Sequence, residues 1–237
     1  MDKKEFEALI LDAVNDKELR SSDIPAIDLY VDQIINLHTE KLKEGSERYH
    51  ERQLTKTMIN NYAKDRVITP VKGKKYTKEQ IIQILIIYAL KGTLSIGEIK
   101  RMLDGAYSID GFDASTIVFF YDKLCQMKAF ERECSVAEVE KLLSANGLDI
   151  ENDEDYLLAI AGLVSMSAFM KNIAQAMIDA KYPEPVEEEE PEREKKEKEK
   201  EKDKEKKEKE PKDKKEKEPK DKKEKEKKKK KSADAAE

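Results

Sequence analysis

The chain has 237 residues, and the 55 residues from Pro183 onward are almost all Lys, Glu, Asp and Pro. Such a segment cannot build a core, which leaves 182 residues for one folded body. No apolar signal sequence is visible near the N-terminus, and the two cysteines lack CxxC spacing, so we expect a cytoplasmic protein without a structural zinc site.

Charge is unevenly distributed along the first 182 residues. Residues 1–51 carry a net charge of −6, residues 52–101 carry +8, and residues 102–182 carry −8. Clustered Lys and Arg side chains can replace the counterions around a phosphate backbone. The middle block therefore points to a polyanionic partner such as a nucleic acid.

The first half of the chain shows helical periodicity up to residue 65. Apolar residues at helical spacing predict helices over 3–19 and 23–42, the second with Pro25 in its first turn, and a short helix over 55–65. Residues 1–23 are assigned to an N-terminal helical segment that precedes the main domain.

The segment 66–76 does not fit a helical pattern. It combines β-branched residues with Pro70 and a turn at Gly73, which predicts a small two-stranded β-hairpin. Capping-box spacing then predicts where three later helices begin. The three pairs are Thr77 with Gln80, Ser95 with Glu98, and Ser135 with Glu138.

The acidic region 105–182 is predicted to be helical and to serve dimerisation or regulation. Helices are expected over 113–130, over 135–145 before Gly147, and over 153–180. The last contains 15 uncharged residues from Tyr156 to Met170, fewer than the ~20 that cross a bilayer. We therefore expect a helix buried in this chain or against a second copy, and no membrane span.

The tail, residues 183–237, contains the sequence PKDKKEKE twice in succession. Its alternating charges place like charges at i,i+4, and its prolines interrupt helices, so we expect disorder. A solubilising role and a role as a contact surface for a charged partner both remain open.

Residues 58–70, 74–77, 81–90 and 94–103 together resemble the DNA-binding domain of MerR-type regulators. The shared pattern is a helix ending at Tyr62, an apolar pair, Pro70, a basic wing ending in Lys74-Lys75-Tyr76, and two helices, the second beginning Leu-Ser-Ile-Gly-Glu-Ile. Residues 24–33 and 54–62 also resemble the DUF1836 family, a bacterial group of uncharacterised function.

These resemblances imply an all-α fold in which residues 24–104 form a MerR-like winged helix-turn-helix with a small β-hairpin wing. The chain departs from the MerR pattern at three positions. Asn60 and Asn61 replace the usual Arg and Tyr, and Arg66 replaces the usual Gly. Asn can still read the edge of an adenine, so DNA contact is compatible with these changes.

The outer face of the short helix and the wing supply the predicted DNA contacts. Asn side chains suit base edges, whereas Lys and Thr suit phosphates. The predicted residues are Thr55, Lys56, Thr57, Asn60, Asn61, Lys64, Arg66, Lys72, Lys74, Lys75 and Tyr76.

The sequence favours neither catalysis nor a bound cofactor or metal. His38 lies on an apolar stripe typical of a core or interface, and His50 has no Cys or His at ligand spacing. We therefore expect a sequence-specific transcriptional regulator that binds double-stranded DNA as a homodimer through its C-terminal helix. The alternative is a helical protein-interaction module that keeps the fold without binding an operator.

Overall fold

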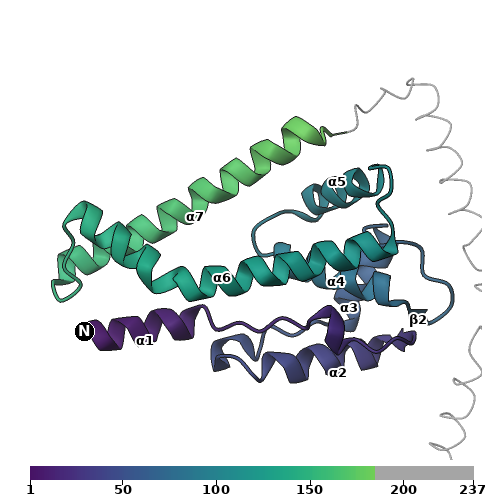
Figure 1. The fold of residues 1–237 in the computed structure, drawn as a ribbon, viewed down its shortest axis with the longest axis horizontal. Helices are drawn as coiled ribbons and strands as arrows, with labels where there is room; N and C mark the ends of the chain where they lie inside the picture. The colour runs from purple at the N-terminus through teal and green to yellow at the C-terminus, as the bar shows by residue number, and fades with distance from the viewer. Residues whose placement is uncertain (185–237) are drawn as a thin grey trace, which may run out of the picture. The chain divides into compact units, whose positions relative to one another are not determined.

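The computed structural model describes residues 1–184, which form seven α-helices and one two-stranded antiparallel sheet (Figure 1). The predictions for the tail lie almost entirely outside these residues. The helices are α1 (Lys3–Ala13), α2 (Val31–Leu42), α3 (Lys56–Lys64), α4 (Lys78–Leu90), α5 (Ile96–Tyr107), α6 (Ala114–Asn146) and α7 (Asp153–Lys181), with 3-10 turns at Ser21–Asp23 and Glu47–Tyr49. The strands are β1 (Leu29–Tyr30) and β2 (Lys75–Tyr76).

Helix α4 lies at the centre of the main core. It begins with the predicted capping box, in which the Thr77 hydroxyl accepts a hydrogen bond from the Gln80 amide at 3.3 Å. The Ser95 capping box at the start of α5 is confirmed in the same way. Six large apolar side chains of α4 are buried, so neighbours cover it on nearly every side. They are Ile81, Ile82, Ile84, Leu85, Ile86 and Ile87.

Helix α6 is one continuous helix rather than the two that were predicted. It runs past Ser135, whose hydroxyl donates to the Arg132 carbonyl at 2.8 Å instead of capping a new helix. A hydroxyl can bond back to the preceding turn in this way without ending a helix, and no Gly or Pro interrupts this stretch. The helix ends at Gly147, as expected, where φ is +63°.

The predicted hairpin within residues 66–76 is wrong. Only its last two residues form a strand, and β2 pairs antiparallel with β1, placing Leu29 opposite Tyr76. The helix predicted over 23–42 is consequently shorter, because Leu29 and Tyr30 are extended and α2 starts only at Val31. The pairing of β1 with the distant β2 therefore keeps Leu29 and Tyr30 extended, where a helix was predicted.

The N-terminal segment packs along α6 (Figure 1). Helix α1 ends at Ala13, six residues earlier than predicted, and buries Phe6 and Ile10 in a second apolar cluster with Leu143 of α6 and Ala159 of α7. The chain then continues in extended form toward Ser21. This second cluster joins α1 to the hairpin between α6 and α7.

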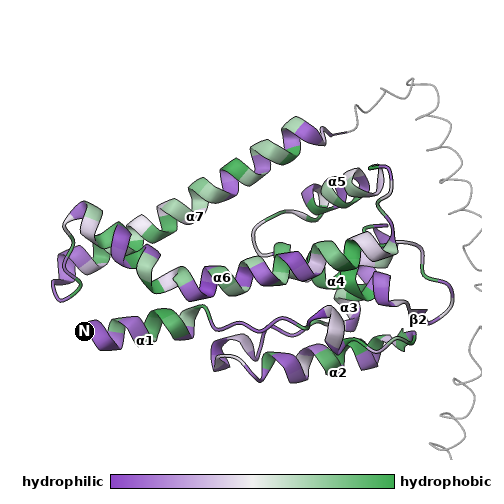
Figure 2. Cartoon of the chain, viewed as in Figure 1, coloured by the Kyte–Doolittle hydropathy of each residue, from purple (hydrophilic) through white to green (hydrophobic). Residues whose placement is uncertain are grey.

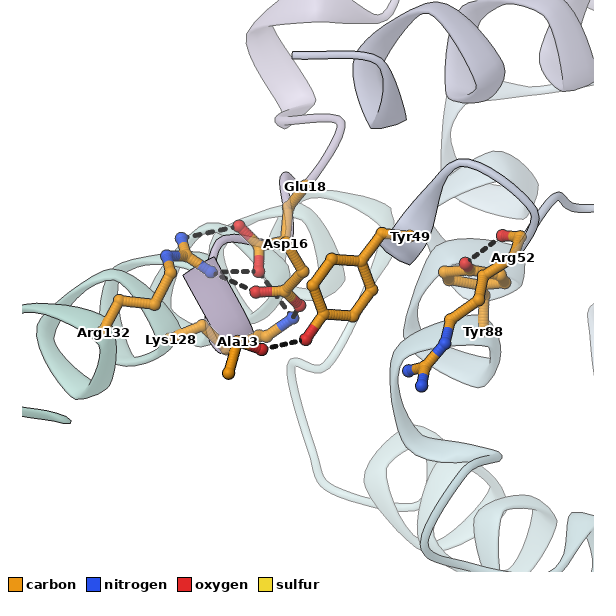
Figure 3. A network of polar contacts seen from close by, with 8 residues as sticks. All are labelled: Ala13, Asp16, Glu18, Tyr49, Arg52, Tyr88, Lys128 and Arg132. Carbon is orange, nitrogen blue, oxygen red and sulfur yellow. Dashed lines mark hydrogen bonds and ion pairs between the residues drawn. The ribbon is translucent and has the colours of Figure 1, made fainter. Parts of the chain in front are cut away.

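An ion-pair network holds the extended segment against α6 (Figure 3). The Lys128 ammonium lies 2.6 Å from Asp16 Oδ2 and 2.5 Å from Glu18 Oε1. Arg132 bonds Glu18 through both terminal nitrogens, at 2.7 and 2.8 Å, and reaches Asp16 at 2.9 Å. Burial alone would raise the pKa of both carboxyls, but the two cations hold each pKa below its ordinary value.

Helix α7 is not a buried core helix of residues 1–184. Only 6% of its most apolar 18-residue window is buried, and among the described residues it alone is long and apolar enough to cross a membrane. Figure 2 shows apolar residues along its length. Its ends are nevertheless held: Ala159 packs in the second cluster and Ile178 in the main core. Residues 1–184 therefore do not bury α7, and its burial against a second copy stays a prediction.

Helix α5 approaches the C-terminal end of α7 closely. Arg101 donates to Asp179 at 2.8 Å and to the Tyr182 carbonyl at 3.0 Å. At Gly105, a Cβ atom would come within 2.2 Å of the Tyr182 ring, so a larger residue there would displace that ring. These contacts fix where α7 ends relative to the main core.

Candidate nucleic-acid interface

Helix α3 presents the predicted polar face to solvent. The Thr55 hydroxyl caps the helix by accepting a hydrogen bond from the Met58 amide at 3.2 Å. Ile59 and Tyr62 are buried and attach the helix to the main core. The opposite side chains are exposed: Lys56, Thr57, Asn60, Asn61 and Lys64.

The loop from Arg66 to Lys74 is anchored to the core where it leaves α3. The Val67 amide donates to the Tyr62 carbonyl at 2.9 Å, and the side chains of Val67 and Ile68 are buried. Because these apolar residues point inward, the start of the loop is tied to the same core as α3.

Two buried glutamines of α4 hold the next part of the loop. Gln83 accepts a hydrogen bond from the Thr69 amide at 2.8 Å, and Gln80 donates to the Pro70 carbonyl at 3.0 Å. Gln80 and Gln83 are 5% and 1% exposed, so these bonds satisfy polar groups that water cannot reach. The loop tip therefore projects from a fixed base, although no hairpin supports it.

The basic side chains of the loop tip and of β2 are exposed. Lys72, Lys74 and Lys75 all face solvent, and the Lys75 ammonium lies 5.1 Å from the centre of the Tyr30 ring. This contact links β2 to β1, and a cation over an aromatic ring contributes about 0.5–1 kcal/mol at an exposed site.

Ten of the eleven predicted DNA contacts are exposed and lie on α3, its N-cap, the following loop and β2. The exception is Tyr76, which is only 7% exposed and packs in the main core. Alternation along the two-residue strand turns Lys75 outward and Tyr76 inward. Tyr76 therefore holds the base of the loop and does not face a ligand.

The basic block does not form one continuous surface. Three of its cations are engaged inside the fold: Lys91 reaches Met58 Sδ at 3.6 Å, Lys100 donates to the Asp65 carbonyl, and Arg101 contacts the end of α7. Within residues 1–184, no ion pair involves Lys64, Arg66, Lys72, Lys74 or Lys75, and Lys56 is 4.0 Å from Asp32. Most of the exposed, unpaired positive charge of the block thus lies on α3, the loop and β2, with Arg52 exposed elsewhere.

Arg66 has a φ of +54°, which places it in the left-handed region that favours glycine. This is the position at which the MerR pattern has Gly. We expect Arg66→Gly to raise the free energy of unfolding relative to Arg66→Ala by about 1 kcal/mol, because only glycine removes the left-handed strain. Urea denaturation of the two variants measures the difference. If Arg66→Ala were as stable as Arg66→Gly or more stable, the inference of backbone strain at Arg66 would be wrong.

A cavity of about 660 Å³, which no pattern in the sequence predicted, adjoins the N-terminal end of α3. Its lining comes from α2, α4, α6, the start of α3, the segment 16–19 and the segment 49–53, several of which are remote from one another in the chain. His38 of α2 is among the lining residues. The apolar stripe around His38 correctly indicated its burial but gave no sign of a cavity beside it.

The fold defines a mostly helical domain with a small two-stranded sheet and a basic helix-and-loop surface. Residues 19–124 match the family described as "Domain of unknown function (DUF1836)", and the chain thus carries a DUF1836 domain in this range. The match extends from the extended N-terminal segment into α6, where Ile117 and Tyr121 belong to the main core. No curated protein and no solved structure matches the chain.

Proposed function

We propose that the DUF1836 domain binds double-stranded DNA through α3 and the loop that follows it, and that the protein regulates transcription. The observation that carries this proposal is the exposed face of α3, which combines amides with cations and continues into the basic loop. An α-helix with such a face fits the major groove. On the resemblance to MerR-type regulators, α2 and α3 form the helix-turn-helix and the loop acts as the wing.

The two kinds of side chain on this surface have different roles in the proposal. Asn60 and Asn61 read base edges, since an amide can pair with adenine N6 and N7. Lys56, Lys64 and Arg66 neutralise phosphates beside α3, and the lysines of the loop neutralise phosphates along the backbone. Thr55 and Thr57 add hydroxyl contacts at the start of the helix.

We expect binding to duplex DNA to weaken steeply as salt rises. Each neutralised phosphate contributes about −0.9 to the slope of log K against log salt, so four to six contacts per domain give a slope of about −4 to −5. Fluorescence anisotropy with a labelled duplex from 50 to 300 mM salt measures the slope. The double variant Lys74→Ala with Lys75→Ala should make the slope less steep by about 2. Asn60→Ala should mainly reduce the discrimination between DNA sequences.

The matched control removes two lysines from α6, with Lys123→Ala and Lys141→Ala. Both side chains are exposed and lie away from α3, and the net charge changes by the same amount. The control should leave the slope within about 0.5 of the wild type, because long-range charge alone is screened. An equal loss in both double variants, or no binding at 50 mM salt, would contradict the proposed interface.

We further propose that two copies pair through α7, which would place two α3 helices on two half-sites. The alternative function, a helical protein-interaction module, is favoured by one specific observation: the same exposed apolar surface of α7. DNA titration separates the two functions, because an interaction module that does not bind DNA would show no salt-dependent affinity.

A further inference from the structure

The cavity behind α3 has a size typical of a small-molecule site. Its volume of about 660 Å³ falls within the ~300–1,000 Å³ of ligand pockets. Its walls include apolar side chains from three regions (Leu19, Leu42 and Leu85) and two tyrosines (Tyr49 and Tyr88). Both tyrosine hydroxyls are engaged: Tyr49 donates to the Ala13 carbonyl and Tyr88 to the Arg52 carbonyl (Figure 3). The tyrosines therefore present ring surface to the cavity from fixed positions.

His38 is one of the residues that line this cavity, and its side chain carries a buried polar atom without a partner in the described chain. The residue is 3% exposed, and its Nδ1 has no hydrogen-bond partner within residues 1–184. Its ring packs edge-on against Tyr88, with centroids 4.4 Å apart. A buried polar atom without a partner costs about 1–3 kcal/mol, so a ligand or a water molecule that bonds Nδ1 would be favoured.

The charged lining has a surplus of unpaired cations. Lys128 is already neutralised by Asp16 and Glu18. By contrast, Lys91 and Arg52 make no ion pair within the described chain, and each lies about 5 Å from a tyrosine ring. Burial lowers the pKa of Lys91, and burial together with the charge of Lys91 lowers the pKa of His38 to about 4. Within the described residues, the unpaired cations of the lining (Lys17, Arg52 and Lys91) outnumber its one unpaired carboxylate, Glu51, so an anion would offset this charge.

We propose that this cavity binds a small organic anion whose apolar or aromatic body lies against Tyr49 and Tyr88 and whose charged group lies near Lys91. His38 then bonds the ligand through Nδ1. The cavity also reaches Thr55 and Met58, so the occupant contacts the first turn of α3. Any effect of the occupant on DNA affinity rests on the proposed function, but the binding itself does not.

The chain has only two histidines, which allows a direct test by NMR of the full-length protein. Benzoate is the probe, benzyl alcohol its neutral counterpart and benzamidine its cationic counterpart. Benzoate should shift the imidazole signals of His38 in a saturable manner. His50 should not respond, because it does not line the cavity and its Nε2 lies 3.3 Å from the Gly45 carbonyl oxygen. The variant His38→Asn identifies which signal belongs to which residue.

Binding of benzoate should also raise the pKa of His38, because the anion offsets the positive field of Lys91. Lys91→Gln should weaken benzoate binding at least tenfold. Lys100→Gln, a matched change on α5 outside the cavity, should change it less than twofold. Thermal unfolding of each variant shows whether the fold is retained.

Several results would overturn the proposal. If the His38 signals responded to none of the probes, the cavity would not bind a ligand at His38 and the proposal would be wrong. An equal response to benzoate and benzamidine would contradict anion selectivity, even if Lys91→Gln fails to fold. None of these measurements contains DNA, so their failure leaves the proposed DNA interface untouched, and loss of DNA binding leaves the cavity proposal untouched.

Discussion

Leu163→Asp should convert a dimer of this protein into monomers and weaken its binding to a palindromic DNA site at least 100-fold. The affinity for a single half-site should change less than threefold. The difference arises because two linked half-sites gain about 10²–10⁴ in affinity from effective concentration, and a monomer loses that gain. Light scattering at micromolar concentration measures the mass, and anisotropy with palindromic duplexes selected from random sequence measures the affinity.

The face of α7 that carries Leu163 supports this expectation. At its two ends, Ala159 and Ile178 are 2% and 7% exposed, so α7 is packed against the protein body there. Between them, Leu163 and Met170 lie on the same side of the helix as Ala159 and are 38% and 57% exposed. Within residues 1–184 the ends of α7 are packed while its middle has no partner, and an exposed apolar stripe of this length is unusual in a monomer.

Two further variants keep the dimer prediction testable. Met170→Asp lies two turns along the same face and is more exposed, so it should give monomers without disturbing the monomer fold. Asn172→Asp adds the same charge on the opposite side of α7 and should leave the dimer intact. A wild-type monomer in light scattering would contradict pairing. If that monomer also floated with lipid vesicles, a membrane would be the partner of α7.

Lys128→Met should lower the free energy of unfolding at pH 7 by about 2 kcal/mol. Removal of one partner from a buried ion pair costs about 3–5 kcal/mol, but these side chains retain some exposure and Arg132 still neutralises the carboxylates, which reduces the cost. Urea denaturation, monitored by circular dichroism, measures the change. Lys123→Met is the control, since its ammonium contacts only the Gln126 amide and the Phe119 ring within the described chain.

The effect of Lys128→Met should depend on pH. The folded-state pKa of Asp16 and of Glu18 is lowered by the cations, so their contribution to stability is present above about pH 4–5 and is lost as the pH falls through the folded-state pKa. The difference in unfolding free energy between wild type and Lys128→Met should therefore shrink at pH 3. A difference that stays constant from pH 7 to pH 3 would show that the methionine acts through packing alone.

Much of the local structure could be predicted because its determinants are close in sequence. The starts of α3, α4 and α5 follow from Thr55, Thr77 and Ser95, each of which caps the amide three residues later. The exposed face of α3 follows from the helical repeat, since Ile59 and Tyr62 must face the core. Most of the candidate interface was therefore visible in the sequence.

The wing region was mispredicted because its partner lies far away in the chain. Residues 66–76 have the composition of a hairpin, but β2 pairs with β1, and Gln80 and Gln83 hold the loop from α4. The same strand pairing turns Tyr76 into the core. Local sequence cannot show whether β2 pairs with an adjacent strand or with a distant one, because either partner satisfies the same backbone N–H and C=O groups.

Sequence alone determined the helical character of the chain, the positive charge of its middle block and the polar face of α3, because each depends on residue type and short-range spacing. Tertiary structure decided how that charge is divided. In the folded protein, Lys91 lines a cavity and Arg101 bonds to α7, whereas the cations of α3 and the loop are exposed. It also decided that α7 is packed at its ends and open in the middle, because the burial of a helix depends on which surfaces the rest of the fold brings against it.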